Sequence, residues 1–355
     1  MKEILQNAQV IVCVGSGGVG KTTVSSAIAL RAAQMGRRVL VLTVDPARRL
    51  KSTMGLENHD EAPITHPSIQ GSLTAAVIDA KKVFDDFVTR SSGNPERIQK
   101  LLNNKLYVQM STTLSGSQEF TALEKLYSSY ESGKYDLIVL DTPPTKHAID
   151  FLEAPQKLSS LFNEKITRWF REPEAHEKGF LRNLVQTGTR QVLRALESLT
   201  GSEFMSELAD FFQNIQQWQG KLEKRIAEMH KVLVNPRTHF LLVTSFDEAK
   251  LKEAEFFSRE IRKSGYRLSG VLINRAYPKG LDLSRQVKGK SDLDKLYQQY
   301  QNYLSEREKV YAGFSIRMSG QGQVLRLPEL MNPISDLEGV LEMAQNMEEA
   351  EVSSK

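Results

Sequence analysis

Short apolar runs alternate along the chain with longer stretches in which apolar residues recur every three or four positions. Six runs are rich in β-branched residues and have few polar positions, which predicts strands covered on both faces. They span residues 8–14, 38–44, 73–79, 136–141, 239–244 and 268–274. Helical spacing lies between them, for example at 21–36, 118–132 and 247–264. Because strands alternate with helices, the pattern predicts an α/β fold with a doubly wound, mostly parallel sheet.

Residues 151–235 interrupt this alternation. They contain no good strand pattern and read as consecutive helices, with apolar spacings of three, four or seven in the last one. We therefore predict a helical subdomain at 151–235, inserted into a core formed by residues 1–150 and 236–355. Residues 282–310 are polar and predict a surface helix with a loop. The acidic tail from Asn346 is expected to be frayed.

Composition narrows the class of protein. Of the 355 residues, 40% are hydrophobic and 25% are charged, as in ordinary globular proteins. The net charge of +4 is small for this length, so nucleic acid is not an expected partner. Cys13 is the single cysteine, which excludes an intrachain disulfide and a multi-cysteine zinc site within one chain. No apolar run approaches the roughly 20 residues of a membrane span, and the polar start of the sequence is unlike a signal peptide. We expect a cytoplasmic protein without stable membrane insertion.

The segment from Val14 to Thr23 reads VGSGGVGKTT and fits the pattern G-x-x-x-x-G-K-[ST] at every fixed position. It follows a predicted strand and opens a predicted helix, which is the context in which this pattern binds nucleotide phosphates. Its glycines leave backbone N–H groups free to surround phosphate oxygens, the lysine supplies positive charge, and the threonine offers a hydroxyl to Mg²⁺. The predicted cofactors are ATP and Mg²⁺, and the predicted contacts come from Gly15, Ser16, Gly17, Gly18, Val19, Gly20, Lys21, Thr22 and Thr23.

Two aspartates follow predicted strands. Asp45, in TVDPARRL, is well placed to orient a water against the γ-phosphate, although an aspartate in a turn or at a helix N-cap has the same local sequence. Asp141 ends LIVLD in the position of a Walker B aspartate, and the Thr-Pro-Pro after it is a candidate switch segment. Lys21 and Asp45 are candidate catalytic residues, and Thr22, Asp45 and Asp141 are the candidate magnesium ligands.

These segments resemble the phosphate loop, switch I and switch II of the arsenical-pump ATPase (ArsA) family, which includes the ATPase that delivers tail-anchored membrane proteins. The likeness rests on GSGGVGKTT, DPARRL and DTPPTKHAIDFL, and it extends to GSEFMSELADFFQNIQ, VLINR and VLRLPEL, so it covers most of the chain. It implies that Asp45 positions the attacking water and that Thr22 ligates Mg²⁺. It also implies that Asn274 and the segment around Pro328 hold the adenine. Family members work as two ATPase halves that face each other, so the implied partner is a second copy or a paralogous ATPase subunit.

Four features depart from the family pattern. Ser16 stands where the family has a signature lysine, Arg48 and Arg49 follow DPA in place of histidine and serine or asparagine, and Lys146 replaces a switch II glycine. No Cys-x-x-Cys pair or cysteine triad is present, so neither the zinc clasp of the tail-anchor ATPase nor arsenite sensing is expected. We predict that Arg48 or Arg49 supplies the missing catalytic cation, because a guanidinium suits phosphate contact. The alternative is that both arginines are solvated loop residues.

Three functions remain open from the sequence. The first is a dimeric ATP-driven enzyme or targeting chaperone whose helical insertion binds an apolar helical client, although a stripe at helical spacing also fits ordinary core packing. The second is a ParA/MinD-like positioning ATPase, and the third is a nucleotide-binding regulatory subunit with little turnover. The long insertion favours the first, as does the acidic stretch 336–355 where a membrane-binding helix would be basic.

Overall fold

The computed structural model describes most of the chain, in segments that form two units. The described residues are 1–44, 54, 56, 60–91, 95–104, 107–108, 117–142, 151, 153, 219–276, 291–320, 322–330 and 332–353. The first unit takes its residues from 1–78, 125–152 and 231–355, and the second from 79–124 and 153–230. Residues 154–218 lie outside the described part, so the predicted boundaries of the insertion stay a prediction.

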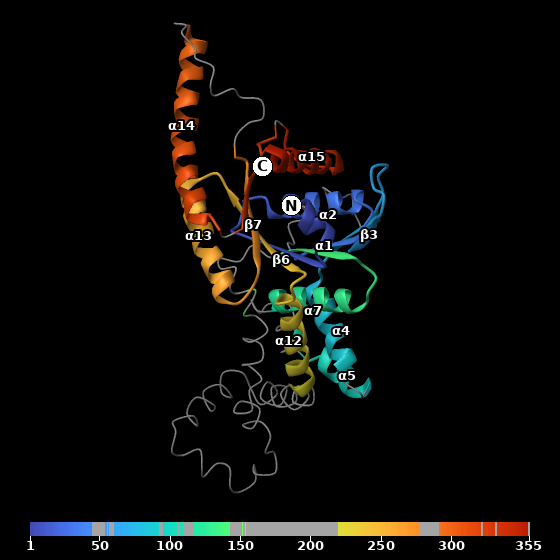
Figure 1. Ribbon diagram of the computed structural model, residues 1–355. Coiled ribbons are helices and arrows are strands. Elements are labelled where there is room, and N and C mark those ends of the chain that lie inside the picture. Colours follow the sequence, from blue (N-terminus) through green and yellow to red (C-terminus); the bar gives the residue numbers. More distant parts are fainter. Residues whose placement is uncertain are drawn as a thin grey trace, which may run out of the picture. The chain divides into compact units, whose positions relative to one another are not determined.

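An eight-stranded sheet forms the centre of the first unit (Figure 1). The strand order is β3-β4-β2-β5-β1-β6-β7-β8, and every neighbouring pair is parallel except β3 with β4. The strands are β1 (Val10–Val14), β2 (Arg38–Thr43), β3 (Glu61–Ile64), β4 (Ser72–Val77), β5 (Leu137–Asp141), β6 (Thr238–Ser245), β7 (Leu268–Asn274) and β8 (Gln323–Arg326). The predicted α/β fold with a mostly parallel sheet is confirmed, and so are its six predicted strands.

The two strands that the sequence pattern did not predict lie at the edges of the sheet. β3 has the sequence EAPI and β8 has QVLR, and each buries only one of its four residues. Edge strands are covered less than central ones, so they need no continuous apolar run. This is why a search for such runs misses them.

Helices cover the sheet of the first unit on both faces. α2 (Lys21–Gln34) packs on β2 and β5, and α1 (Lys2–Asn7) and α15 (Leu337–Ser353) pack on α2. α13 (Glu248–Lys263) packs on β6 and β7, and α14 (Asp292–Met318) packs on α13. Parallel crossovers are right-handed, so α2, which leads from β1 towards one edge, lies on the opposite face from α13, which leads towards the other edge.

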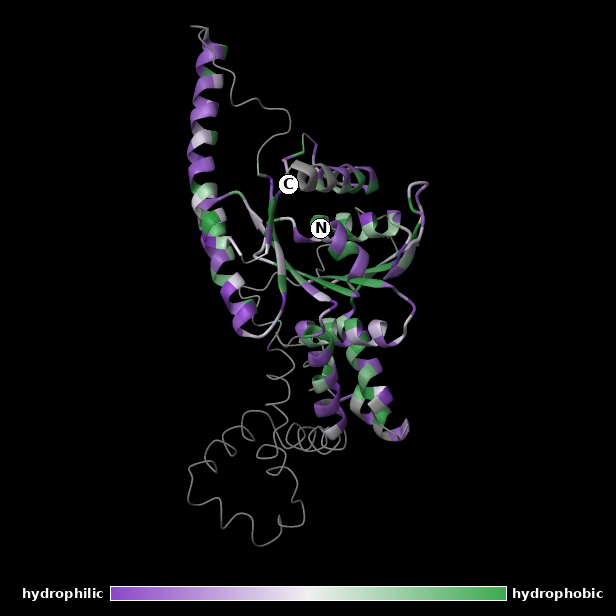
Figure 2. Cartoon of the chain, in the orientation of Figure 1, coloured by the Kyte–Doolittle hydropathy of each residue, from purple (hydrophilic) through white to green (hydrophobic). Residues whose placement is uncertain are grey.

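The core of this unit is built from the central strands and α2. All residues of β1 and β5 are buried, which fits the predicted strands with apolar side chains on both faces. Figure 2 shows the same strands as hydrophobic, whereas much of α14 is hydrophilic. Within the described part of the chain, no helix combines the length and the apolar content needed to cross a membrane.

The C-terminal segment is helical, contrary to expectation. The tail from Asn346 was expected to be frayed, but α15 continues to Ser353, and Asn346 and Met347 are buried. The reason is an apolar face that Val340, Ala344 and Met347 form at helical spacing and bury in the core that α2 also lines. The predicted surface helix at 282–310 is observed as α14, which begins at Asp292 and runs on to Met318, where Phe314 and Met318 are buried.

The second unit is helical where it is described. It contains α4 (Ala80–Ser91), α5 (Pro95–Leu102) and parts of α7 (Ser117–Glu131) and α12 (Gln219–Leu233), both of which continue into the first unit. Rings of Phe84, Phe87, Tyr107 and Phe120 cluster with centroids 5.6 to 6.3 Å apart. Arg225 on α12 donates to both carboxylate oxygens of the buried Glu124 on α7, at 2.7 and 2.8 Å.

Candidate nucleotide site

The predicted phosphate loop connects the carboxyl end of β1 with the amino end of α2. Gly15 has φ 152° and Gly20, the N-cap of α2, has φ 86°. A Cβ atom on Gly15 would collide with the carbonyl oxygen of Val243 on β6, and one on Gly20 would collide with the side-chain amide of Asn274. Both positions therefore require glycine, for backbone conformation and for space.

The amino end of α2 is positively charged, through the helix dipole and the side chain of Lys21. A helix N-terminus presents unpaired N–H groups and a partial positive charge, which favours bound phosphate. Lys21, the first residue of α2, is buried, and its Nζ donates to the carbonyl oxygen of Ser16 at 3.1 Å. Ser16 itself is only 6% exposed within this chain. This hydrogen bond keeps the lysine side chain against the loop that is predicted to bind the phosphates.

One carboxylate joins three elements beneath the loop. The hydroxyl of Thr22 on α2 donates to Asp141 Oδ2 at 2.6 Å, and the hydroxyl of Thr43 at the end of β2 donates to the same oxygen at 2.8 Å. All three side chains are buried, and Thr43 and Asp141 are register partners in the β2–β5 pair. Hydroxyl and carboxylate oxygens are the ligands that Mg²⁺ prefers, so Thr22 and Asp141 fit the predicted magnesium site.

The two predicted switch segments begin directly after this cluster. Residues 45–50 follow β2 after Val44, and residues 143–150 follow Thr142, whose hydroxyl donates to the carbonyl oxygen of Cys13 at 2.9 Å. The switch residues themselves lie outside the described part of the chain, namely Asp45, Arg48, Arg49, Lys146 and His147. Their roles stay predictions.

The two segments expected to hold adenine lie side by side. Asn274 ends β7, and Pro328 follows Leu327, whose N–H donates to the carbonyl oxygen of Ile273 at 2.8 Å. Asn274 is buried, and its Nδ2 donates to the carbonyl oxygen of Val19 in the phosphate loop at 2.9 Å. The structure thus brings both segments to the carboxyl end of β7, with Asn274 against the loop. Contact of either segment with adenine remains a prediction.

Two residues at the site were missed by the sequence analysis. Thr43 stands two positions before Asp45, and its polarity at the end of an apolar strand was the available signal. Arg275 has φ 52°, which is uncommon for a residue with a side chain, and its N–H donates to Asn274 Oδ1 at 3.0 Å. No sequence pattern predicts that backbone conformation, because arginine has no special preference for it.

Cys13 lies inside the site's strand but carries no exposed thiol. It is fully buried in β1, and burial raises the pKa of its thiol to about 12. Among the described residues no cluster of three or more histidine, cysteine, aspartate or glutamate side chains could hold a metal ion.

Comparison with known proteins extends the likeness from single motifs to most of the chain. The family model described as anion-transporting ATPase matches residues 8–318. Two proteins of Aquifex aeolicus, provisionally named arsenical pump-driving ATPases 2 and 1, are each 23% identical, over 83% and 95% of this chain and 89% and 78% of their own lengths. The ATPase GET3 of Paracoccidioides lutzii is 25% identical over 91% of this chain and 88% of its own.

The family match and the geometry of the site point the same way. The matched residues include the glycine loop, the strands β2 and β5 that end at Thr43 and Asp141, and the segment with Asn274. The chain therefore belongs to the anion-transporting (ArsA) ATPase family and is an ATPase.

Proposed function

We propose that this chain is a Mg²⁺-dependent ATPase that works as a dimer and uses its nucleotide state to rearrange a helical subdomain. The observation that carries the proposal is the shared hydrogen bonding of Thr22 and Thr43 to one oxygen of Asp141. Both predicted switch segments leave the sheet within two residues of this cluster. A change at the phosphates would therefore act on both segments at once.

The proposed reaction is attack of water on the γ-phosphate, with cleavage of the bond between the γ-phosphorus and the bridging oxygen and release of ADP. Asp45 orients the water, and Lys21 and the N–H groups of the loop neutralise phosphate charge. Thr22 and Asp141 hold Mg²⁺, which supplies further positive charge when bound. Thr43 fixes the carboxylate of Asp141 so that it keeps one orientation.

Dimerisation follows from the resemblance to a family with two facing halves. Each chain contributes one phosphate loop, and the predicted partner is a second copy or a paralogous subunit. With Ser16 in place of lysine, the cation at the γ-phosphate comes from Arg48 or Arg49, in the same chain or across the dimer. We place the protein in the cytoplasm.

An apolar helical client is the proposed cargo of the helical subdomain at 151–235. Support comes from the apolar stripe in its sequence and from the resemblance to the tail-anchor ATPase. Two relatives are named for arsenical pumps, but this chain has one cysteine, and that cysteine is buried. Arsenite is therefore not proposed as a ligand.

A membrane-positioning ATPase of the ParA/MinD kind is less well supported. Such a protein would need an amphipathic helix with its apolar face available to lipid. The apolar face of α15 is instead buried, with Val340 and Met347 both 0% exposed.

ATP turnover and oligomeric state test the proposal together. Lys21→Ala and Thr22→Ala should abolish turnover, because phosphoryl transfer depends on charge neutralisation and positioning. Lys252→Ala, at an exposed position on α13, serves as the matched control and should hydrolyse ATP like the wild type. Asp45→Asn should bind ATP and, by light scattering, accumulate as a dimer. Wild-type turnover in Lys21→Ala would refute the site, and a monomer in Asp45→Asn with MgATP would refute the nucleotide-dependent dimer.

A further inference from the structure

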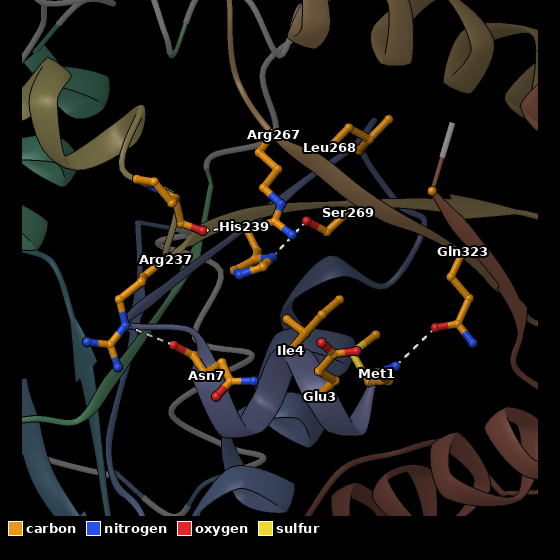
Figure 3. Close-up of a pocket in the computed structure, with 12 residues that line it drawn as sticks. Met1, Glu3, Ile4, Asn7, Arg237, His239, Arg267, Leu268, Ser269 and Gln323 are labelled. Atoms are coloured by element: carbon orange, nitrogen blue, oxygen red, sulfur yellow. Dashed lines mark hydrogen bonds between the residues drawn. The ribbon is translucent and has the colours of Figure 1, made fainter. Parts of the chain in front are cut away.

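A cavity of about 560 Å³ lies at the amino ends of β6, β7 and β8. The phosphate loop follows the carboxyl end of β1, and β1 and β6 are parallel. This cavity therefore lies at the opposite ends of the strands from the phosphate loop. α1 forms one wall, and the first residues of β6, β7 and β8 with the residues just before them form the others (Figure 3). Its volume lies within the roughly 300–1,000 Å³ of small-molecule sites.

Cationic side chains predominate around the cavity. Arg237 and Arg267 line it, and Glu3 is the one carboxylate among the described residues that line it. Within the described part of the chain, neither arginine forms an ion pair. Among the described residues each side chain makes one hydrogen bond, from Arg267 Nη1 to the carbonyl oxygen of Pro236 at 2.8 Å and from Arg237 Nε to that of Asn7 at 3.2 Å. A guanidinium has five N–H donors, so most of them remain for a ligand.

The polar groups on the floor of the cavity are already arranged. His239 is buried, and its Nδ1 lies 2.7 Å from the hydroxyl oxygen of Ser269, which fixes the imidazole ring. Figure 3 shows Arg267 beside this pair. Burial and the charge of Arg267 lower the pKa of His239 to about 4, while the charge of Glu3 opposes this shift. The imidazole is therefore neutral at pH 7, and positive charge in the cavity comes from the two arginines and from the N-terminal ammonium of Met1, which donates to Gln323 Oε1 at 3.0 Å.

We propose that this cavity binds a small organic anion through a phosphate or carboxylate group held by Arg267, with Arg237 at the rim. Guanidinium groups bind such oxyanions with paired, charge-assisted hydrogen bonds. Ile4 and Leu268, which also line the cavity, offer apolar contact to the body of the ligand. The site is separate from the ATP site and would allow a second molecule to bind to the same unit.

Titration with simple probes tests this proposal on the intact chain. Phenyl phosphate and benzoate are the anionic probes, benzamide is the neutral control, and saturating MgADP keeps the probes from the phosphate loop. The NMR signals of the His239 ring report on this site specifically. Because a bound anion offsets the charge of Arg267, the pKa of His239 should rise from about 4 when an anion binds, and benzamide should leave it unchanged.

Substitution then identifies the group that holds the anion. Arg267→Gln should weaken binding by about tenfold or more, because it removes a charge-assisted contact, and Arg267→Lys should retain part of the affinity. Arg259→Gln, at an exposed position on α13, is the matched control and should bind like the wild type. Stronger binding of phenyl phosphate than of benzoate would identify a phosphate ligand, and the reverse order a carboxylate. If neither anion moves the His239 signals, or if Arg267→Gln binds both as tightly as the wild type, the arginines only tether backbone carbonyls and the proposal is wrong.

Discussion

The hydroxyl of Thr43 donates a hydrogen bond of 2.8 Å to Asp141 Oδ2, the same oxygen that accepts from Thr22. Thr43 ends β2 and Asp141 ends β5, and the two are register partners in the sheet. The strand that leads to Asp45 and the strand that leads to Thr-Pro-Pro are thus joined at their last positions. If the segments after these two strands act as the predicted switches, this bond gives a direct route by which they respond together.

Replacement of Thr43 by valine should lower ATP turnover. Valine keeps the branched shape but leaves the buried carboxylate of Asp141 with one donor fewer, which should slow hydrolysis by about tenfold or more. Steady-state turnover at saturating MgATP measures the effect. Thr43→Ser keeps the hydroxyl and should restore most of the rate. Full activity in Thr43→Val would show that Asp141 does not need this partner.

Replacement of Asn274 by alanine should weaken ATP binding. The side chain supports the phosphate loop through the carbonyl oxygen of Val19, and the family resemblance also assigns it to the adenine. We expect a loss of affinity of about tenfold from one removed hydrogen bond to a nucleobase and a less rigid loop. Calorimetry with ATP and GTP separates the two roles. An adenine contact predicts a larger loss for ATP than for GTP, whereas equal losses would contradict that contact.

The charge that Ser16 lacks should come from Arg48 or Arg49. Removing the arginine that replaces the lysine should slow hydrolysis by on the order of 10³-fold, as for arginine fingers. Single Arg48→Ala and Arg49→Ala variants, assayed beside Ser16→Lys, measure this. If both alanine variants retain turnover within a few-fold of the wild type, the cation has another source, such as a partner subunit.

The stability of the fold should depend on pH through His239. Its pKa is about 4 in the folded chain, below the ordinary 6.5, so the unfolded chain binds a proton that the folded chain does not. The contribution of neutral His239 to the free energy of unfolding is therefore fully present above about pH 6.5 and is lost as the pH drops towards 4. Urea denaturation at pH 7.5 and pH 5 measures the change. His239→Gln should show a smaller loss between the two pH values, and an unchanged loss would assign it to other groups.

Cys13 should be unreactive in the folded protein. Its thiol is fully buried with a pKa of about 12, so almost no thiolate exists at pH 8. Mass spectrometry should find no N-ethylmaleimide adduct until denaturant is added.

Metal analysis of the native protein should find no zinc, since the buried thiol of Cys13 cannot bind a zinc ion shared with a partner. One chelation-resistant zinc per dimer, or rapid alkylation of the native protein, would contradict this.

The sequence by itself determined the fold class, the six covered strands and the phosphate loop. Local patterns determine each of these, since a strand covered on both faces must be apolar throughout and a loop that encloses phosphate must be rich in glycine. The same patterns singled out Lys21, Thr22 and Asp141, because each stands at a fixed distance from a strand end.

Tertiary structure decided what depends on contacts between distant segments. The role of Thr43 exists only because β2 pairs with β5, and Asn274 supports the loop only because β7 ends beside it. The acidic C-terminal segment becomes a helix to Ser353 because its apolar face is buried in the core that α2 lines. The cationic cavity is lined by α1, His239 and Arg267, which are far apart in sequence. They come together at the amino ends of parallel strands. No local pattern encodes such meetings, since they follow from strand order and packing.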